Sequence, residues 1–347
     1  MNKVLHVTEC LNTGVYLAIK GSIISSPDFE HHLLYENRKD SPSPDLLALH
    51  HLGVITYRWE GGLVKKRIQL NIIQKKINPN ITHLHSSWAG FIGRLIPMNS
   101  RLVYSSHGFG FQRKDCNAIF RFAFYLIEII LQMNTSANIA YMPYEYALLR
   151  NILKSKKIYF ANMDFWNFSF AGINNKRKLS SSSKNKQIVS IGRITRAKDP
   201  YFFLKVVIEI RKLGYVDDIL WIGDGAIEYR ELFRKNKIKV TGWLDDEELY
   251  QILSVTDAAL LTSAWDSGPA TLFQLINYGI PVILRDFPAA KYLPLESFSS
   301  PVELATNILK VFVAPEEYAE NQVLRLNNFF QSIHMTPISE IYMEILR

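Results

Sequence analysis

The chain has 347 residues and a net charge of +8, and 48% of its residues are hydrophobic. This length exceeds that of one ordinary domain and favours two domains, each of about 150 to 200 residues. The hydrophobic content excludes a disordered protein. The two cysteines, Cys10 and Cys116, have no metal-binding or redox spacing, and such sparse use suits a reducing compartment.

Short runs rich in Val, Ile and Leu alternate with longer helical patterns through the first half of the chain. This alternation is typical of βαβ units and a parallel sheet. A helix is expected, for example, over residues 62–77. The predicted strands of this half are residues 3–7, 31–36, 54–59, 82–86, 102–106, 139–143 and 157–163.

The longest apolar stretch, residues 119–133, is interrupted by Arg121 and Glu128. It is shorter than the roughly 20 apolar residues that a membrane-spanning helix needs. The first ten residues contain no basic segment followed by a long apolar one, so no signal peptide is predicted. We therefore expect a protein that is not transmembrane.

A basic, serine-rich stretch, residues 174–187, has almost no apolar content and is predicted to be a linker. The alternation of strands and helices then begins again. The predicted strands of the second half are residues 188–194, 218–225, 239–243, 258–263 and 281–286, and the predicted helices are residues 200–213, 226–236, 246–254 and 269–278.

Two α/β halves joined by a linker predict two doubly wound, Rossmann-like domains that face each other across a cleft. Ligands of open α/β sheets bind at the carboxyl ends of the strands, so two such sheets would share one site. We set the domains at residues 1–170 and 188–325, with the linker at residues 171–187. Residues 326–347 are predicted to form a C-terminal helix that packs back on the first domain.

Charge is distributed unevenly between the two halves. Residues 1–165 contain 19 Lys and Arg against 11 Asp and Glu, whereas residues 187–347 contain 16 against 21. This asymmetry indicates that the first half meets an anionic partner, either a membrane surface or a polyanion. The alternative, of equal weight on charge alone, is a solvated basic face.

An acid, Asp266, and an amide, Gln274, lie on either side of a Ser-Gly-Pro break in the second half. Pro269 suits a first helical position, so free backbone N–H groups near Ala270 and Thr271 would point into the cleft. The N-terminus of a helix is an anion site. The alternative is an ordinary βαβ corner whose acid faces water.

Two cations follow a strand end at Gly192, where the absence of a side chain allows close approach of the backbone. Arg193 and Lys198 on this loop suit a diphosphate, the first through a bidentate fork and the second as a point charge. Solvated surface charge is the alternative. Gly223 and Gly242 mark two further strand ends, for which simple tight turns are the alternative.

Histidines are the candidate functional residues of the first half. His107 lies between a strand end and a Gly-rich turn, where it would hydrogen-bond a substrate or act as an acid or base. His83 and His85 share one face of a strand. No third metal ligand stands at a useful spacing, so core packing or substrate contact is favoured over a metal site.

Together these segments resemble the family-4 retaining glycosyltransferases, which have the GT-B fold. Four second-half segments occur in the family's order and spacing, and two first-half segments are similar to those of members that build bacterial surface polysaccharides such as O-antigen. The segments are residues 192–200, 222–225, 240–263 and 266–283, and residues 82–95 and 103–111.

The resemblance implies a role for each matching side chain. Arg193 and Lys198 would neutralise the donor diphosphate as it leaves. Asp266 would bind hydroxyl groups of the donor sugar, and Gln274 would hydrogen-bond the nucleotide ribose. His107 would contact the donor sugar beside the reacting carbon.

The resemblance also implies roles for backbone positions. Amides near Ala270 and Thr271 would cradle phosphate, and Gly223 and Gly242 would line the base pocket. Gly14 stands where the family often has a glycine pair beside the diphosphate. The predicted substrate-binding set also includes Gly192 and Gly268.

The implied activity is that of a retaining, metal-independent hexosyltransferase. It would move a sugar from a nucleotide-sugar, for which we assume UDP, to a lipid-diphosphate-linked saccharide. No cofactor is expected, since no D-x-D pair is present to hold a divalent metal at a diphosphate. No nucleic-acid partner is expected. The protein would be cytoplasmic, or peripheral at the inner face of the bacterial plasma membrane.

Residues 113–131 would lie on that membrane as a basic, aromatic helix, and ordinary core packing is the alternative. Two other functions are weighed. Gln274 and Asp266 stand where the family has glutamates, which motivates a catalytically silent GT-B protein that serves another transferase as a scaffold. A GT-B sugar epimerase fits less well, because such enzymes carry a different arrangement of acids in the second half.

Overall fold

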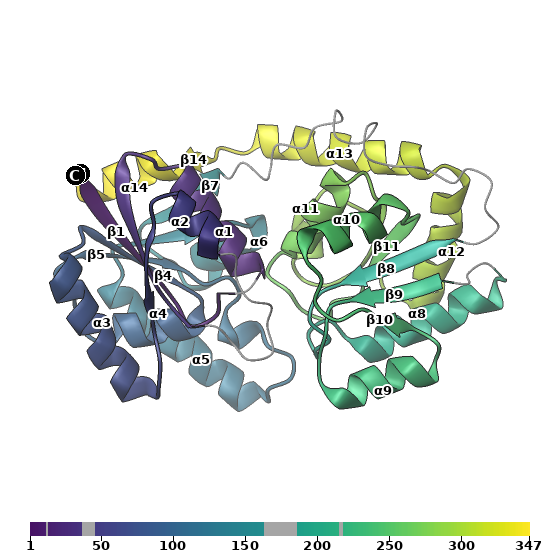
Figure 1. Ribbon diagram of the computed structural model, residues 1–347, viewed down its shortest axis with the longest axis horizontal. Coiled ribbons are helices and arrows are strands. Elements are labelled where there is room, and N and C mark those ends of the chain that lie inside the picture. Colours follow the sequence, from purple (N-terminus) through teal and green to yellow (C-terminus); the bar gives the residue numbers. More distant parts are fainter. Residues whose placement is uncertain (12, 37–45, 163–185, 215–217) are drawn as a thin grey trace. The chain divides into compact units, whose positions relative to one another are not determined.

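The computed structural model divides into two compact units, each an α/β structure built on a sheet of parallel strands (Figure 1). Unit 1 comprises Met1–Asp164 and His334–Arg347, and unit 2 comprises Phe165–Ile333. The described residues are 1–11, 13–36, 46–162, 186–214 and 218–347.

The linker predicted over residues 171–187 lies outside the described residues except for its last two positions. Of these, Gln187 begins strand β8. The segment therefore ends inside the second sheet and not before it.

Unit 1 contains an eight-stranded sheet in the order β14-β7-β6-β5-β4-β1-β2-β3, with parallel pairing throughout. Most strands are short and are buried along nearly their whole length, as expected for a parallel sheet covered on both faces. The strands are β1 (Asn2–Thr8), β2 (Phe29–Tyr35), β3 (Ile55–Arg58), β4 (Ile81–His85), β5 (Arg101–Ser105), β6 (Ala137–Ala140), β7 (Ile158–Asn162) and β14 (Thr336–Pro337).

In the described part of unit 1, the α-helices that accompany this sheet are α1 (Thr13–Ile24), α2 (Leu46–His51), α3 (Leu63–Ile77), α4 (Ser87–Arg94), α5 (Ala118–Leu131), α6 (Pro143–Ala147) and α14 (Ile338–Leu346). The single helix predicted over residues 326–347 is wrong. Residues up to Ser332 complete a helix of unit 2, and β14 separates them from α14. Tyr342 of α14 is fully buried and hydrogen-bonds Nδ1 of His83 at 2.8 Å, so α14 belongs to unit 1.

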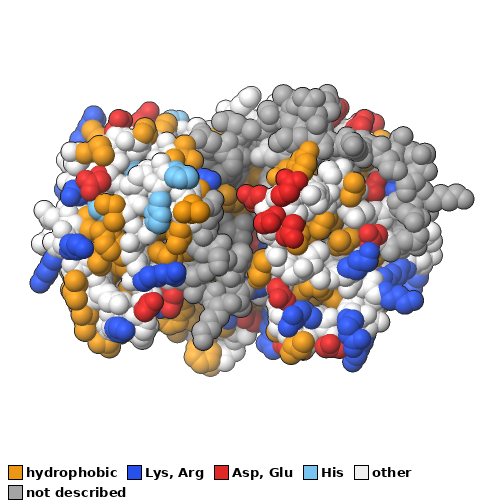
Figure 2. Space-filling view, in the orientation of Figure 1, with side chains coloured by type: hydrophobic (Ala, Val, Ile, Leu, Met, Phe, Trp, Pro, Cys, Tyr) orange, Lys and Arg blue, Asp and Glu red, His pale blue; other side chains and the backbone are white. Residues whose placement is uncertain are grey.

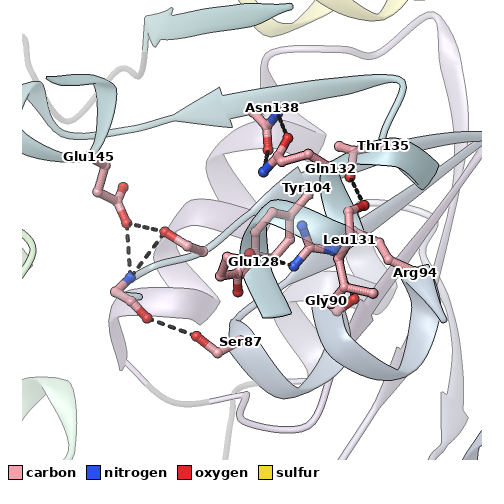
Figure 3. A network of polar contacts seen from close by, with 12 residues as sticks. Ser87, Gly90, Arg94, Tyr104, Glu128, Leu131, Gln132, Thr135, Asn138 and Glu145 are labelled. Carbon is pink, nitrogen blue, oxygen red and sulfur yellow. Dashed lines mark hydrogen bonds and ion pairs between the residues drawn. The ribbon is translucent and has the colours of Figure 1, made fainter. Parts of the chain in front are cut away.

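A buried ion pair attaches α5 to its neighbours (Figure 3). Nη2 of Arg94 lies 2.8 Å from Oε2 of Glu128, and Tyr104 O–H donates to Oε1 of Glu128 at 3.2 Å. The guanidinium of Arg94 also lies over the Tyr104 ring, 3.6 Å from its centroid. Gly90 leaves room for that ring, because a Cβ there would lie 2.2 Å from Tyr104. Glu128, one of the two charges that interrupt the apolar stretch, therefore holds α5 against the rest of unit 1.

The rest of the apolar surface of α5 is largely exposed. Ile119 is 78% exposed, Phe120 60%, Phe122 59% and Ile130 63%. Ordinary core packing, the alternative considered for this helix, therefore fails for most of its apolar side chains. Figure 2 shows hydrophobic side chains interspersed with Lys and Arg on the visible face of unit 1. Within the described parts of the chain, no helix combines the length and apolar character needed to cross a bilayer.

Unit 2 contains a six-stranded parallel sheet in the order β10-β9-β8-β11-β12-β13. One cluster of its core is formed by aromatic and branched side chains that include Phe203, Trp221 and Phe233. The strands are β8 (Gln187–Ile191), β9 (Asp218–Ile222), β10 (Lys239–Val240), β11 (Ala258–Leu261), β12 (Val282–Arg285) and β13 (Ser297–Phe298).

Three helices of unit 2 begin at a capping side chain. Asp199 caps α8, Asp245 caps α10 and Ser300 caps α12, and each side chain accepts a hydrogen bond from an early backbone N–H. The helices are α8 (Pro200–Lys212), α9 (Ile227–Lys235), α10 (Asp246–Ser254), α11 (Ala270–Asn277), α12 (Pro301–Val313) and α13 (Pro315–Ser332).

Candidate functional site

The carboxyl ends of β8, β9 and β10 are joined by hydrogen bonds. Gly192 N–H donates to the Ile222 carbonyl at 2.9 Å, and Gly223 N–H donates to the Gly242 carbonyl at 3.0 Å. The Trp221 indole donates to the Gly192 carbonyl at 2.7 Å. The structure therefore brings the three predicted glycines to one edge of the second sheet.

Glycine is required at Gly223 because the backbone of a neighbouring loop passes directly over it. Its φ is +128°, and a Cβ would lie 2.4 Å from the Gly192 carbonyl oxygen. Gly242 also has a positive φ, +76°, but open space surrounds it. The two positions share a backbone conformation that disfavours side chains, and only the first is also closed sterically.

Lys198 and Asp266, two predicted site residues, form an ion pair. Nζ of Lys198 lies 2.7 Å from Oδ2 of Asp266, and the side chains are 20% and 21% exposed. Oδ1 of Asp266 accepts the Gly268 N–H at 3.2 Å. Thr262 donates to the Lys198 carbonyl at 3.0 Å and ties the two loops together. A cation and an acid thus meet at the carboxyl ends of β8 and β11.

Arg193 lies on the same loop as Lys198, between β8 and α8, and is partly buried. The loop is held in place where Ile194 N–H donates to the Asp224 carbonyl at 2.8 Å. Two predicted cations therefore come from one short, anchored connection.

The helix start that follows Asp266 leaves polar groups unpaired. Pro269 is the cap residue and not, as predicted, the first helical residue, and α11 begins at Ala270 without a side-chain cap. Among the described residues, the buried hydroxyl groups of Thr271 and Ser263 have no hydrogen-bond partner. Free amides and hydroxyl donors beside a helix N-terminus favour an anion. Gln274 lies in the second turn of α11 and is partly exposed.

Asp199 and Arg285 form an ion pair that the sequence analysis did not identify. Nη1 of Arg285 lies 2.7 Å from Oδ2 of Asp199 and stands over the Phe202 ring. The φ of Asp199 is +52°, a left-handed conformation. Its other oxygen accepts Phe202 N–H at 3.1 Å and caps α8. An Asp-Pro pair before an apolar helix is a recognisable capping signal.

A pocket of about 440 Å³ adjoins this loop in unit 2. Three aromatic side chains, two acids and a base line it, so it offers stacking surfaces together with polar groups. The lining residues are Arg196, Asp199, Pro200, Tyr201, Glu228, Tyr229, Ala264 and Trp265. No sequence pattern predicts this pocket, because its aromatic residues come from separate loops and helices.

In unit 1, His107 follows β5 in a left-handed conformation, with φ +48°. Glu145 accepts the next amide, Gly108 N–H, at 2.9 Å and the Ser106 hydroxyl at 3.0 Å. Tyr141 stacks on the histidine ring, with the centroids 5.3 Å apart. Burial lowers the pKa of His107 to about 4, so the imidazole is neutral near pH 7.

The prediction that His83 and His85 lack a third partner is wrong. His6 on the neighbouring strand β1 lies opposite His83 in register, and one ring nitrogen of each of the three lies within 4.8 Å of the others. All three are buried, and burial lowers the pKa of each well below 6.5. No local pattern indicates this group, because His6 is 77 positions away from His83.

Gly14, unlike the other predicted glycines, belongs to unit 1. It is exposed in the first turn of α1 in unit 1, and no atom lies within 4 Å of where its Cβ would be. A ligand could occupy the space beside Gly14, but this geometry does not indicate which ligand.

Comparison with protein families identifies the central part of unit 2. Residues 185–312 match the family described as Glycosyl transferases group 1. This segment contains the Lys198–Asp266 pair, the three joined glycines and α11.

Curated bacterial relatives match parts of the chain. A 41.2 kDa protein from the cps region of Klebsiella pneumoniae, itself uncharacterised, is 28% identical over 223 residues, covering 60% of each chain. The Escherichia coli UDP-Gal:α-D-GlcNAc-diphosphoundecaprenol α-1,3-galactosyltransferase is 25% identical over 254 residues, covering 64% of this chain and 62% of its own. The matches thus span about 60% of the length of these relatives.

Solved structures match nearly the whole chain. Sucrose-phosphate synthase from Thermosynechococcus elongatus superposes with a TM-score of 0.73 at 14% identity, covering 99% of this chain and 97% of its own. Anabaena HepE, solved with UDP and glucose, gives a TM-score of 0.71 at 14% identity, covering 100% and 99%.

The class of protein follows from these findings: two α/β units with parallel sheets, matching GT-B structures over the full length, define the GT-B fold. Within that fold, residues 185–312 match the family of glycosyl transferases group 1. The sequence predicted the GT-B fold and a resemblance to glycosyltransferases, and both predictions are confirmed.

Proposed function

We propose that this protein is a retaining glycosyltransferase that moves a sugar from a UDP-sugar to a lipid-diphosphate-linked saccharide. The ion pair between Lys198 and Asp266, placed beside the uncapped start of α11 in a group 1 domain, carries the proposal. The UDP-bound Anabaena structure and the galactosyltransferase from E. coli support the choice of nucleotide and acceptor.

The proposed donor site binds the nucleotide-sugar through both charged groups and hydrogen bonds. Lys198 and Arg193 neutralise the diphosphate as the bond to the sugar breaks, and amides at Ala270 and Thr271 cradle a phosphate. Asp266 binds hydroxyl groups of the sugar. Before the donor binds, Asp266 holds Lys198 in place, which reduces the entropy lost when the ammonium meets the diphosphate.

Retention of configuration follows if the acceptor hydroxyl enters on the face from which the nucleotide leaves. No protein nucleophile is then required, and the departing phosphate oxygen takes the acceptor proton. Two side-chain cations carry the charge that a divalent metal would otherwise balance, so we propose a metal-independent reaction. Catalysis consists mainly of positioning and of electrostatic stabilisation of the leaving group.

The exposed apolar face of α5 supports an acceptor embedded in a membrane. Its aromatic and branched side chains lie close in sequence to Arg113, Lys114 and Arg121, which would meet anionic headgroups. We propose that unit 1 contacts the inner face of the bacterial plasma membrane through this helix, while the protein itself remains peripheral.

The direct test is a transfer assay with purified protein. UDP-galactose is offered first, followed by other UDP-sugars and GDP-sugars, with a synthetic GlcNAc-diphosphate-lipid as acceptor and detection of released nucleotide. Arg193→Ala is expected to lower turnover at least tenfold. Unchanged turnover in that variant would show that the diphosphate site is wrongly assigned.

Gln274 favours one second candidate, a catalytically silent scaffold for another transferase, because an amide stands where related proteins have an acid. Gln274 keeps the reach needed to hydrogen-bond a ribose, as donor and acceptor, but carries no charge. Calorimetric titration with nucleotide-sugars separates the two functions. Heat of binding without turnover, or no heat at all, would favour the scaffold.

A further inference from the structure

Four histidines of unit 1 form one hydrogen-bonded chain that starts at Ser26. Nε2 of His31 lies 2.9 Å from the Ser26 carbonyl oxygen, and Nδ1 of His31 lies 3.1 Å from Nε2 of His6. Nδ1 of His6 lies 3.1 Å from Nε2 of His85. Nδ1 of His85 lies 3.0 Å from Nε2 of His107. Every link between rings therefore joins one Nδ1 to one Nε2.

The first link sets the direction of the chain. A carbonyl oxygen only accepts, so Nε2 of His31 must carry the hydrogen. The Ser26 hydroxyl, 3.3 Å from the same nitrogen, donates to the Ser22 carbonyl and so also acts as an acceptor toward His31. The opposite tautomer of His31 would bring its lone pair against two acceptors in a buried site, which is unfavourable.

Each ring then dictates the next, because a neutral imidazole has one donor and one acceptor. Burial lowers the pKa of all four histidines, so they are neutral near pH 7. Nδ1 of His31 accepts from His6, Nδ1 of His6 accepts from His85, and Nδ1 of His85 accepts from His107. His107 therefore carries its hydrogen on Nε2 and keeps a lone pair on Nδ1.

We infer that His31, His6 and His85 are positioning residues that fix His107 as the Nε2–H tautomer and make its Nδ1 an acceptor for a substrate hydroxyl group. His107 is partly exposed, and among the described residues its Nδ1 has no hydrogen-bond partner. Stacking on Tyr141 holds the ring plane. That the hydroxyl belongs to a sugar rests on the proposed function, whereas the tautomer does not.

A metal site is the competing use of the buried trio His6, His83 and His85, and the hydrogen bonds oppose it. Ser105 donates to the Ile139 carbonyl at 2.8 Å and so accepts from Nε2 of His83, 2.9 Å away. The Tyr342 hydroxyl then donates to Nδ1 of His83. Because every ring nitrogen of the trio has a partner, a cation would have to displace existing hydrogen bonds.

The test is measurement of the tautomers by long-range ¹H–¹⁵N correlation spectra of the whole protein labelled in its histidines. The sequence has nine histidines, and single His→Gln variants assign their signals. At pH 7.5 we expect His6, His31, His85 and His107 to be neutral with the hydrogen on Nε2. If His107 of the unmodified protein is cationic, or is neutral with its hydrogen on Nδ1, the inference is overturned.

A substitution three rings away tests whether the tautomer is transmitted. His31→Leu removes the acceptor for His6, so the remaining rings can reverse and His107 is expected to gain an Nδ1–H population. His31→Gln keeps one acceptor and one donor and is expected to restore the original spectrum. His32→Leu is the matched control, because this neighbour bonds Glu30 outside the chain.

Two results would contradict the proposed hydrogen-bonded chain of histidines. The first is a folded His31→Leu variant in which the tautomer of His107 is unchanged. That result is expected if His31 has only a structural role. The other is stoichiometric binding of Zn²⁺ with loss of the ring hydrogen bonds, which would establish a metal site. Failure to turn over any nucleotide-sugar would reject the proposed function but leave these spectra as expected.

Discussion

The ammonium of Lys198 and the carboxylate of Asp266 lie 2.7 Å apart although the two residues are 68 positions apart in sequence. The contact joins the loop after β8 to the loop after β11, two strands that are neighbours in the second sheet. It places a cation and an acid next to a helix N-terminus whose amides are uncapped, which is an arrangement suited to a sugar diphosphate.

Replacing Lys198 with Met is expected to lower the rate of sugar transfer by about 100- to 1000-fold, the usual effect of removing one donor from a site that stabilises developing negative charge. Steady-state kinetics with the UDP-sugar donor measure this. Lys212→Met is the control, because Lys212 also pairs with an acid, Glu209, but at the exposed end of α8. A Lys198→Met enzyme within twofold of normal would remove this residue from the donor site.

Replacing Gly223 with Ala is expected to destabilise unit 2 by roughly 2–5 kcal/mol, through a strained φ and a Cβ that meets the Gly192 carbonyl. Gly242→Ala shares the positive φ without the collision and should cost about 1–2 kcal/mol. Urea unfolding followed by fluorescence compares the two. Equal losses would mean that the backbone at Gly223 moves freely.

Replacing Glu128 with Gln leaves Arg94 buried without a counter-charge, so we expect a loss of about 3–5 kcal/mol in the free energy of unfolding. The double variant Arg94→Met with Glu128→Leu removes both charges and should recover most of that loss. Denaturation curves supply the measurement. The exposed pair of Arg325 and Glu296 serves as control, and its removal should have little effect. A double variant as unstable as the single one would contradict this account.

Stability is expected to fall as the pH decreases from about 6.5 toward 4. Burial lowers the folded-state pKa of His6, His83 and His85 well below 6.5 and that of His107 to about 4, so the unfolded chain binds these protons first. Proton uptake on unfolding makes acid destabilising in this window and has no effect above it. Urea unfolding at several pH values measures the slope, and His107→Gln should reduce it by about one proton. A flat profile between pH 6.5 and 4 would contradict neutral burial.

Replacing Phe120 and Phe122 with Asp is expected to lower binding to vesicles containing phosphatidylglycerol by about tenfold or more at low salt, because apolar surface is lost and like charge is added. Vesicle co-sedimentation provides the measurement. Val302→Asp changes an exposed apolar residue of unit 2 and should bind as the unmodified protein does. If the unmodified protein does not bind anionic vesicles, the proposal that α5 contacts the membrane is wrong.

Local pattern alone determined much of this protein. Short runs rich in Val, Ile and Leu, alternating with helical patterns, predicted the strands, since the strands of a buried parallel sheet are largely apolar. The glycines at strand ends and the Lys198 loop also followed from the sequence, because turn conformation and charge are properties of short segments. These patterns predicted two α/β domains, and the resemblance of their segments to a known family then implied the GT-B fold and a site in the second half.

The tertiary structure decided which distant residues meet. His6 reaches His83 and His85 only because β1 lies between β2 and β4 in the sheet, and Arg285 reaches Asp199 across 86 positions. The order of strands in a parallel sheet depends on how crossovers bury both faces, which no local period records. Likewise, the exposure of α5 depends on which face its neighbours cover. An apolar helix looks the same in sequence whether its surface packs inward or faces water.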